Sequence, residues 1–107
     1  MGQQVPEVET LNILNVELTN KAAILYQNMP NPFGDGTSIR YFIPEGVKNA
    51  AIIFHNEFGQ ELKTVEITEK GMGQINLTTT NLTSAIYTYS LLVDGKLLET
   101  KRMMKVE

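Results

Sequence analysis

The sequence predicts an all-β protein, an immunoglobulin-like antiparallel β-sandwich of about seven strands. Short runs in which apolar and polar residues alternate recur along the chain, and turn residues separate them at intervals of roughly 8–12 residues. No run shows the 3.6-residue period of an amphipathic helix. The chain has 107 residues and no cysteine. It is therefore long enough for one domain with a hydrophobic core, which neither disulfides nor a thiolate metal site would hold together.

The predicted strands follow one another with turn residues between them. Strands are expected at residues 24–26, 37–43, 49–55, 60–68, 74–78, 86–93 and 96–106, after a short leading strand at residues 11–18. Turns are expected at residues 44–46, 56–59, 70–73 and 94–95. Asp94-Gly95 is the strongest two-residue hairpin signal in the chain, and Gly59 provides the positive φ that the 56–59 turn calls for.

The alternation also predicts which side chains share an apolar face of each strand. These sets are Ile39, Tyr41 and Ile43; Ala50, Ile52 and Phe54; Val65 and Ile67; Ile75 and Leu77; and Tyr87, Tyr89, Leu91 and Val93. We expect these faces to meet as the core of the sandwich.

Charge and hydropathy divide the chain into two parts. Residues 1–23 are predicted to be a linker with a short leading strand from an upstream region, and residues 24–107 the sandwich domain. The first 20 residues hold three glutamates and no Lys or Arg, whereas the other 87 hold nine acidic and nine basic side chains. A neutral domain without a basic stripe argues against nucleic acid as a partner. No apolar run would span a membrane and no signal peptide is present, so we expect a cytoplasmic protein or one piece of a longer exported protein.

Side chains that carry chemistry are scarce. The single histidine, His55, ends a predicted strand, and both aspartates, Asp35 and Asp94, precede a glycine in a turn, where they shape the backbone. Catalysis would need a nucleophile, a base or paired carboxylates in one pocket, and a metal would need further ligands near His55. We therefore predict a protein that is not an enzyme, with no metal and no cofactor.

The last strand carries a small basic cluster beside two methionines. Its residues are Lys101, Arg102, Met103, Met104 and Lys105. Lysines on an edge strand protect it from aggregation, and a receptor that reads a basic, apolar C-terminus would use the same residues. The residue pattern leaves both interpretations open.

Residues 25–33, Leu-Tyr-Gln-Asn-Met-Pro-Asn-Pro-Phe, form a stretch unusually rich in turn residues before the 37–43 strand. Pro30 and Pro32 fix their own φ and bias Met29 and Asn31 toward extended conformations, so this corner is expected to be rigid.

Together these segments resemble one family, the type A C-terminal sorting domain of the bacterial type IX (Por) secretion system. The family's Leu-x-Gln-Asn-x-Pro-Asn-Pro-Phe corner is intact at residues 25–33, its Thr-x-Ile-x-Tyr strand at 37–41, and its Thr-Lys-[Lys/Arg]-apolar tail at 100–104. The resemblance covers residues 24–106. Ala85 stands where the family generally has glycine, and if this position needs a positive φ, alanine would cost about 1 kcal/mol there. Residues given a structural role by the resemblance or by turn chemistry are Pro30, Asn31, Pro32, Phe33, Gly59, Gly73, Tyr87, Tyr89 and Gly95.

The resemblance implies a non-catalytic C-terminal secretion signal that directs an attached N-terminal cargo across the outer membrane. Implied partners are the type IX translocon, its outer-membrane shuttle protein and a sortase-like peptidase, with passage through the periplasm to the cell surface or the medium. Residues 101–105 would be the recognised tail, and peptidase cleavage would fall between residues 18 and 24. Removal of the last five residues is expected to abolish export and leave the fold largely intact.

Two other functions remain open from the residues. An adhesion or carbohydrate-binding module would need an exposed aromatic platform, for which only Phe42 and Phe58 are candidates. A structural spacer of a surface protein would fit the acidic linker and would tolerate further sequence after residue 107. An uncovered edge strand would also allow an edge-to-edge dimer.

Overall fold

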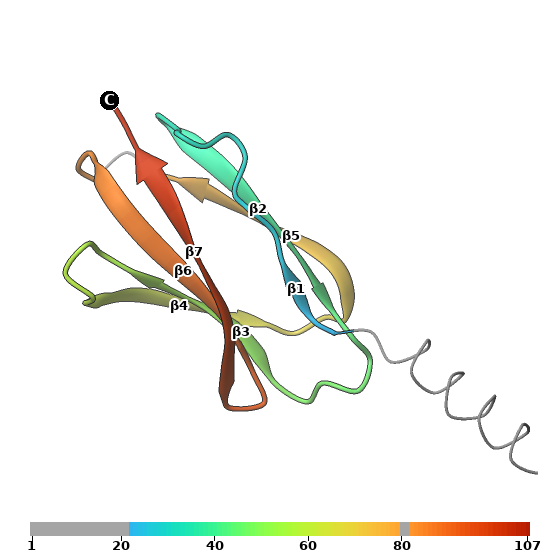
Figure 1. The fold of residues 1–107 in the computed structure, drawn as a ribbon. Coiled ribbons are helices and arrows are strands. Elements are labelled where there is room, and N and C mark those ends of the chain that lie inside the picture. The colour runs from blue at the N-terminus through green and yellow to red at the C-terminus, as the bar shows by residue number, and fades with distance from the viewer. Residues whose placement is uncertain (1–21, 80–81) are drawn as a thin grey trace, which may run out of the picture.

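The computed structural model describes residues 22–79 and 82–107, which form two antiparallel β-sheets packed face to face (Figure 1). The strands are β1 (Ile24–Leu25), β2 (Gly36–Ile43), β3 (Ala50–His55), β4 (Glu61–Ile67), β5 (Gly71–Thr78), β6 (Ala85–Val93) and β7 (Lys96–Lys105). One sheet has the order β1-β2-β5 and the other β4-β3-β6-β7. The predicted all-β sandwich of seven strands is confirmed. The strand expected at residues 11–18, and with it most of the 1–23 linker, lies outside the described residues.

The chain crosses between the sheets after β2, after β4 and after β5. The hairpins β3–β4 and β6–β7 stay within the larger sheet. This connectivity places the first and last strands, β1 and β7, at edges of different sheets on the same side of the sandwich.

The core contains the side chains that the alternation predicted, and Leu25, Phe33 and Met103 in addition. Ile39, Ile52, Tyr89 and Leu91 have no exposed surface, and Val65, Ile67, Ile75 and Leu77 are partly buried against them. Tyr87 lies near the start of β6, and its hydroxyl donates a hydrogen bond of 2.8 Å to the carbonyl of Thr83, four residues upstream. This is the tyrosine corner of immunoglobulin-like domains, in which the residue two further on is usually a core cysteine. Here that residue is Tyr89.

Two hairpins are closed by the expected turn residues. Asp94 and Gly95 have φ values of 50° and 82°, as a two-residue turn between right-twisted strands needs. The Asp94 carboxylate also accepts hydrogen bonds from the backbone N–H groups of Lys48 and Asn49, which ties this hairpin to the β2–β3 connection. In the β3–β4 hairpin Gly59 has φ of 82°, and the Asn56 side chain accepts bonds from two backbone N–H groups of the turn.

The turn predicted at residues 70–73 is wrong over most of its length, because β5 begins at Gly71. Gly73 lies within the strand, paired with Tyr41 of β2, and a Cβ atom there would lie closer than 3.0 Å to the Tyr41 ring. Gly73 is thus needed because the tyrosine ring packs over its backbone. Ala85 does not need a positive φ: in the described part of the chain Asp94 is the one residue other than glycine that has it.

Candidate functional site

The corner at residues 25–33 and the C-terminal strand, which the sequence presents as separate motifs, are in direct contact. Phe33 forms a parallel bridge with Lys105, in which the Phe33 N–H donates to the Met104 carbonyl at 2.9 Å and the Val106 N–H donates to the Phe33 carbonyl at 2.8 Å. The Asn31 side-chain oxygen accepts a hydrogen bond of 2.8 Å from the Met104 N–H. The corner therefore joins the edge of the three-stranded sheet to the end of β7.

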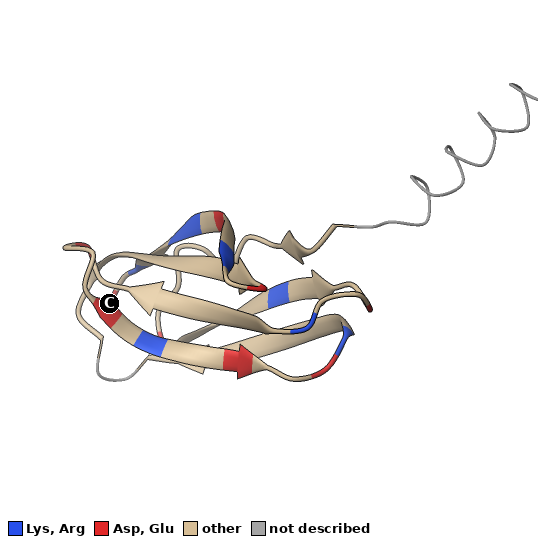
Figure 2. Cartoon of the chain, turned by 90° about the horizontal axis from the view of Figure 1, so that it is seen from below, with Lys and Arg blue, Asp and Glu red and all other residues tan. Residues whose placement is uncertain are grey.

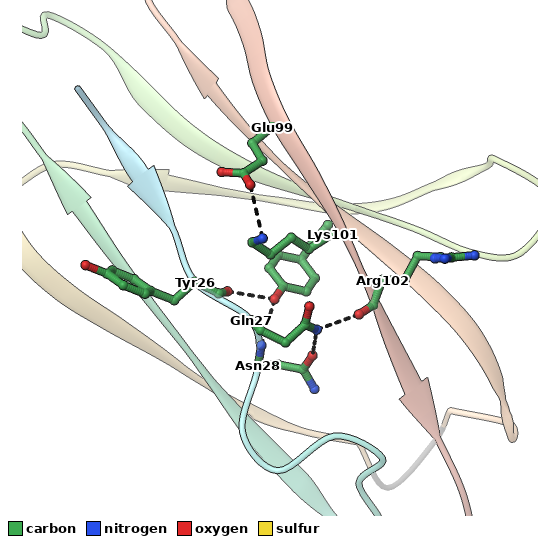
Figure 3. A network of polar contacts seen from close by, with 7 residues as sticks. Tyr26, Gln27, Asn28, Glu99, Lys101 and Arg102 are labelled. Carbon is green, nitrogen blue, oxygen red and sulfur yellow. Dashed lines mark hydrogen bonds and ion pairs between the residues drawn. The ribbon is translucent and has the colours of Figure 1, made fainter.

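Gln27 extends this junction by one more contact. Its side-chain amide donates to the Arg102 carbonyl at 2.7 Å and to the Asn28 side-chain oxygen at 2.6 Å (Figure 3). Gln27 is itself exposed, so its amide covers a backbone carbonyl of the edge strand from the solvent side.

Asn28 is the buried centre of the corner, with 1% of its surface exposed. Its side-chain amide donates to the Pro30 carbonyl at 3.0 Å and to the Thr37 hydroxyl at 3.1 Å, and the same hydroxyl donates to the Pro30 carbonyl at 2.8 Å. These bonds fix the turn that carries Pro30 and Pro32, both of which follow cis peptide bonds. Asn28 and Thr37 were not predicted to have roles of their own, although both lie within the motifs at residues 25–33 and 37–41.

Tyr89 connects this corner to the core. Its hydroxyl donates to the Tyr26 carbonyl and accepts from the Asn28 N–H, both at 2.8 Å. The centroid of its ring lies 6.2 Å from that of Phe54. Burial raises the pKa of Tyr89 to about 12, with Glu99 adding to the rise and the hydrogen bond from Asn28 opposing it. The two hydrogen bonds of the hydroxyl hold the backbone of Tyr26 and Asn28 in place, and the raised pKa extends the protonated form further into the alkaline range.

The five residues predicted to be recognised lie on opposite faces of β7. Met103 and Lys105 are buried, with 2% and 9% of their surfaces exposed, and Lys101 is partly buried. Arg102 and Met104 project outward. Removal of the last five residues would take Met103 out of the core and the bonding partners away from Phe33 and Asn31, which contradicts the expectation that such a truncation leaves the fold intact.

An open groove of about 560 Å³ lies where the corner meets β7. It is lined by Gln27, Asn31, Ile86, Thr100, Lys101, Arg102, Met103 and Met104. Lys101 forms an ion pair of 3.0 Å with Glu99 (Figure 3), whereas Arg102 makes no ion pair within residues 22–79 and 82–107. Ile86 and Met104, directly opposite one another on β6 and β7, are 41% and 42% exposed. The groove thus combines a guanidinium that no described carboxylate pairs with and an exposed apolar pair.

Elsewhere, Lys and Arg are interspersed with Asp and Glu over the strands and hairpins (Figure 2). His55 is partly buried at the end of β3, and Phe58 is 80% exposed at the tip of the β3–β4 hairpin. Phe42 is half-buried. Among the described residues no three or more His, Cys, Asp or Glu side chains are grouped so as to hold a metal ion, and no helix is long and apolar enough to cross a membrane.

Comparison of the chain with protein-family models, with curated proteins and with solved structures finds no match.

Proposed function

We propose that this domain is a non-catalytic C-terminal secretion signal that directs an attached N-terminal cargo across the outer membrane by the type IX system. The translocon and its shuttle protein recognise the domain. A sortase-like peptidase then removes the domain or anchors the cargo. The route runs through the periplasm to the cell surface or the medium. The proposal rests on the motifs of the resemblance, since no comparison names a relative.

The observation that carries the proposal is the contact between its two most specific motifs. The corner bonds to β7 through Gln27, Asn31 and Phe33, so the two motifs form one surface although they lie at opposite ends of the domain sequence. On this surface Arg102 and Met104 are the exposed tail side chains, whereas Lys101 is partly buried and paired with Glu99. We assign recognition to Arg102 and Met104, and we assign Met103 and Lys105 to the support of the fold.

The test is an export assay with the full chain fused behind a periplasm-targeted fluorescent reporter in a type IX-competent bacterium. A truncation after Arg102 would mix loss of fold with loss of recognition, so the informative variant is Arg102→Ala combined with Met104→Ala. Lys63→Ala is a matched control, because Lys63 is an exposed cation on β4, at the opposite edge of the sheet from β7. We expect the reporter outside the cell for the unchanged domain and the control, and in the periplasm for the double variant.

Purified variants are compared by thermal unfolding, so that a fold defect is seen separately. Export of the double variant at the level of the unchanged domain would refute the assigned residues. If the unchanged domain leaves the reporter in the periplasm, the secretion function itself fails and the spacer function gains support. A spacer would also tolerate a tag placed after Glu107, where a sorting signal needs its free C-terminus.

A further inference from the structure

The outer edge of β7 is occupied along one part of its length and open along the next. β7 is an edge strand, so one row of its backbone N–H and C=O groups points away from β6. In that row, the Val106 N–H, the Met104 C=O and N–H, and the Arg102 C=O all bond to the corner. The partners are the Phe33 backbone and the side chains of Asn31 and Gln27.

Among residues 22–79 and 82–107, the next groups in the same row have no such partner. Alternate residues of a strand direct their backbone groups to the same side, so the row continues from Arg102 to Thr100. Within the described residues nothing in the other sheet or the corner bonds the Arg102 N–H or the backbone groups of Thr100. A register shift opposite Leu91 and Leu92 ends the regular ladder shortly beyond Thr100. The open edge is therefore short. It begins at the Arg102 N–H, because the Arg102 carbonyl is bonded to the Gln27 amide.

The side chains around this open edge favour one kind of occupant. Arg102 provides a positive charge without a carboxylate partner in the described part of the chain. Ile86 and Met104 lie on the same outer face and leave an exposed apolar pair beside it. An added strand places side chains on that face at every second residue. A carboxylate opposite Arg102 and an apolar side chain two residues away would match both features.

We propose that the Thr100–Arg102 edge of β7 is a strand-addition site for an extended segment of a partner protein that carries a carboxylate and, two residues away, an apolar side chain. The added main chain bonds to Thr100 and to the Arg102 N–H, and Gln27 limits the length of the site by occupying the Arg102 carbonyl. Backbone pairing supplies affinity and Arg102 supplies selectivity. The identification of the partner as a component of the secretion machinery rests on the proposed function; the binding chemistry does not.

The probe is the blocked peptide Thr-Val-Thr-Glu-Thr-Val-Thr, which places valine, glutamate and valine on one face of an extended strand. It is titrated into the ¹⁵N-labelled full chain while the amide resonances are followed. The expected result is saturable shifts centred on Thr100 and Arg102, with slower hydrogen exchange of those two amides. The same peptide with glutamine for glutamate should bind roughly fivefold more weakly, as should Arg102→Gln with the original peptide. Lys63→Gln, at an exposed cation on β4 at the far edge of the sheet, is the matched control and should bind as the unchanged chain does.

Two further measurements separate backbone pairing from side-chain docking. Peptides N-methylated at even or at odd positions block opposite edges of the strand, so one should lose binding and the other retain it. Gln27→Ala exposes one more carbonyl and should strengthen binding roughly threefold to fivefold, whereas a merely structural role for Gln27 would leave the affinity unchanged or lower it.

Equal binding of both methylated peptides, shifts centred on another edge, or no binding would each overturn the proposal. Shifts at Thr100 and Arg102 that depend on protein concentration without peptide would assign the edge to a second copy of the chain and would also overturn it. The titration needs no secretion machinery. Its failure is therefore distinguishable from failure of the export assay, which tests the proposed function.

Discussion

Replacement of Tyr89 by phenylalanine removes one hydroxyl from the junction between core and corner. That hydroxyl makes two bonds of 2.8 Å, to the Tyr26 carbonyl and from the Asn28 N–H, and neither Tyr89 nor Asn28 is open to water. A buried hydrogen bond contributes about 1 kcal/mol net, and a buried partner left without one costs about 1–3 kcal/mol. We therefore expect Tyr89→Phe to lower the free energy of unfolding by about 2–4 kcal/mol at pH 7.

The same substitution should change the response to alkaline pH. The pKa of Tyr89 is about 12 in the folded protein, against about 10 for an unperturbed tyrosine. The folded state holds the proton more tightly, so this contribution is complete below pH 10 and is lost as pH rises toward 12. These values give a loss of about 1 kcal/mol at pH 11. The difference in stability between the unchanged protein and Tyr89→Phe should shrink by that amount between pH 7 and pH 11.

Urea unfolding followed by circular dichroism at pH 7, 9 and 11 measures both effects. Tyr41→Phe is the matched control: the Tyr41 hydroxyl has no hydrogen-bond partner within the described residues, so its loss should change stability by less than about 0.5 kcal/mol. A Tyr89→Phe variant within 0.5 kcal/mol of the unchanged protein at pH 7, or a difference that stays constant to pH 11, would refute this account.

Three further substitutions test the packing around the site, each by urea unfolding. Gly73→Ala should destabilise by about 1–3 kcal/mol because its Cβ meets the ring of its cross-strand partner, whereas Gly46→Ala, with open space around it, should be nearly neutral; equal effects would contradict this explanation. Met103→Ala should cost about 2–4 kcal/mol and Met104→Ala under about 1 kcal/mol, and the reverse order would show that the two faces of β7 are misassigned. Asp94→Ala should cost about 1–2 kcal/mol, because two backbone N–H groups lose their acceptor and alanine is strained at φ of 50°; a neutral effect would contradict this role.

Most of the fold could be predicted because period-two alternation and turn residues are local signals. The strands from residue 36 onward begin and end within a few residues of their predicted bounds, and the hairpin at Asp94-Gly95 is where its dipeptide indicates. The start of β5 was missed for a physical reason. Gly71 and Gly73 look like turn residues in sequence, but Gly73 is required by the ring of Tyr41, a contact between different strands.

The candidate site was less predictable because its bonds join residues far apart in the chain. The Asn28 N–H bonds to the Tyr89 hydroxyl across 61 positions, and the Gln27 side chain bonds to Arg102 across 75. Nor does the sequence distinguish Met103 from Met104. Their burial follows from the register that pairs Met103 with buried Tyr87 and Met104 with exposed Ile86.

The position of the tail within the sandwich restricts how a receptor could read it. A receptor that binds residues 101–105 as a linear peptide would have to remove Met103 from the core and break the bonds between β7 and the corner. The cost of losing one buried methionine alone, about 2–5 kcal/mol, is a large share of the 5–15 kcal/mol that stabilises a typical domain. A receptor that binds the folded edge incurs no such cost, but it meets only the exposed Arg102 and Met104, the partly buried and ion-paired Lys101, and the open backbone groups near Thr100. The same tail residues therefore cannot all be recognition determinants while the domain stays folded. Under the proposed function, Met103 and Lys105 are expected to affect export through stability.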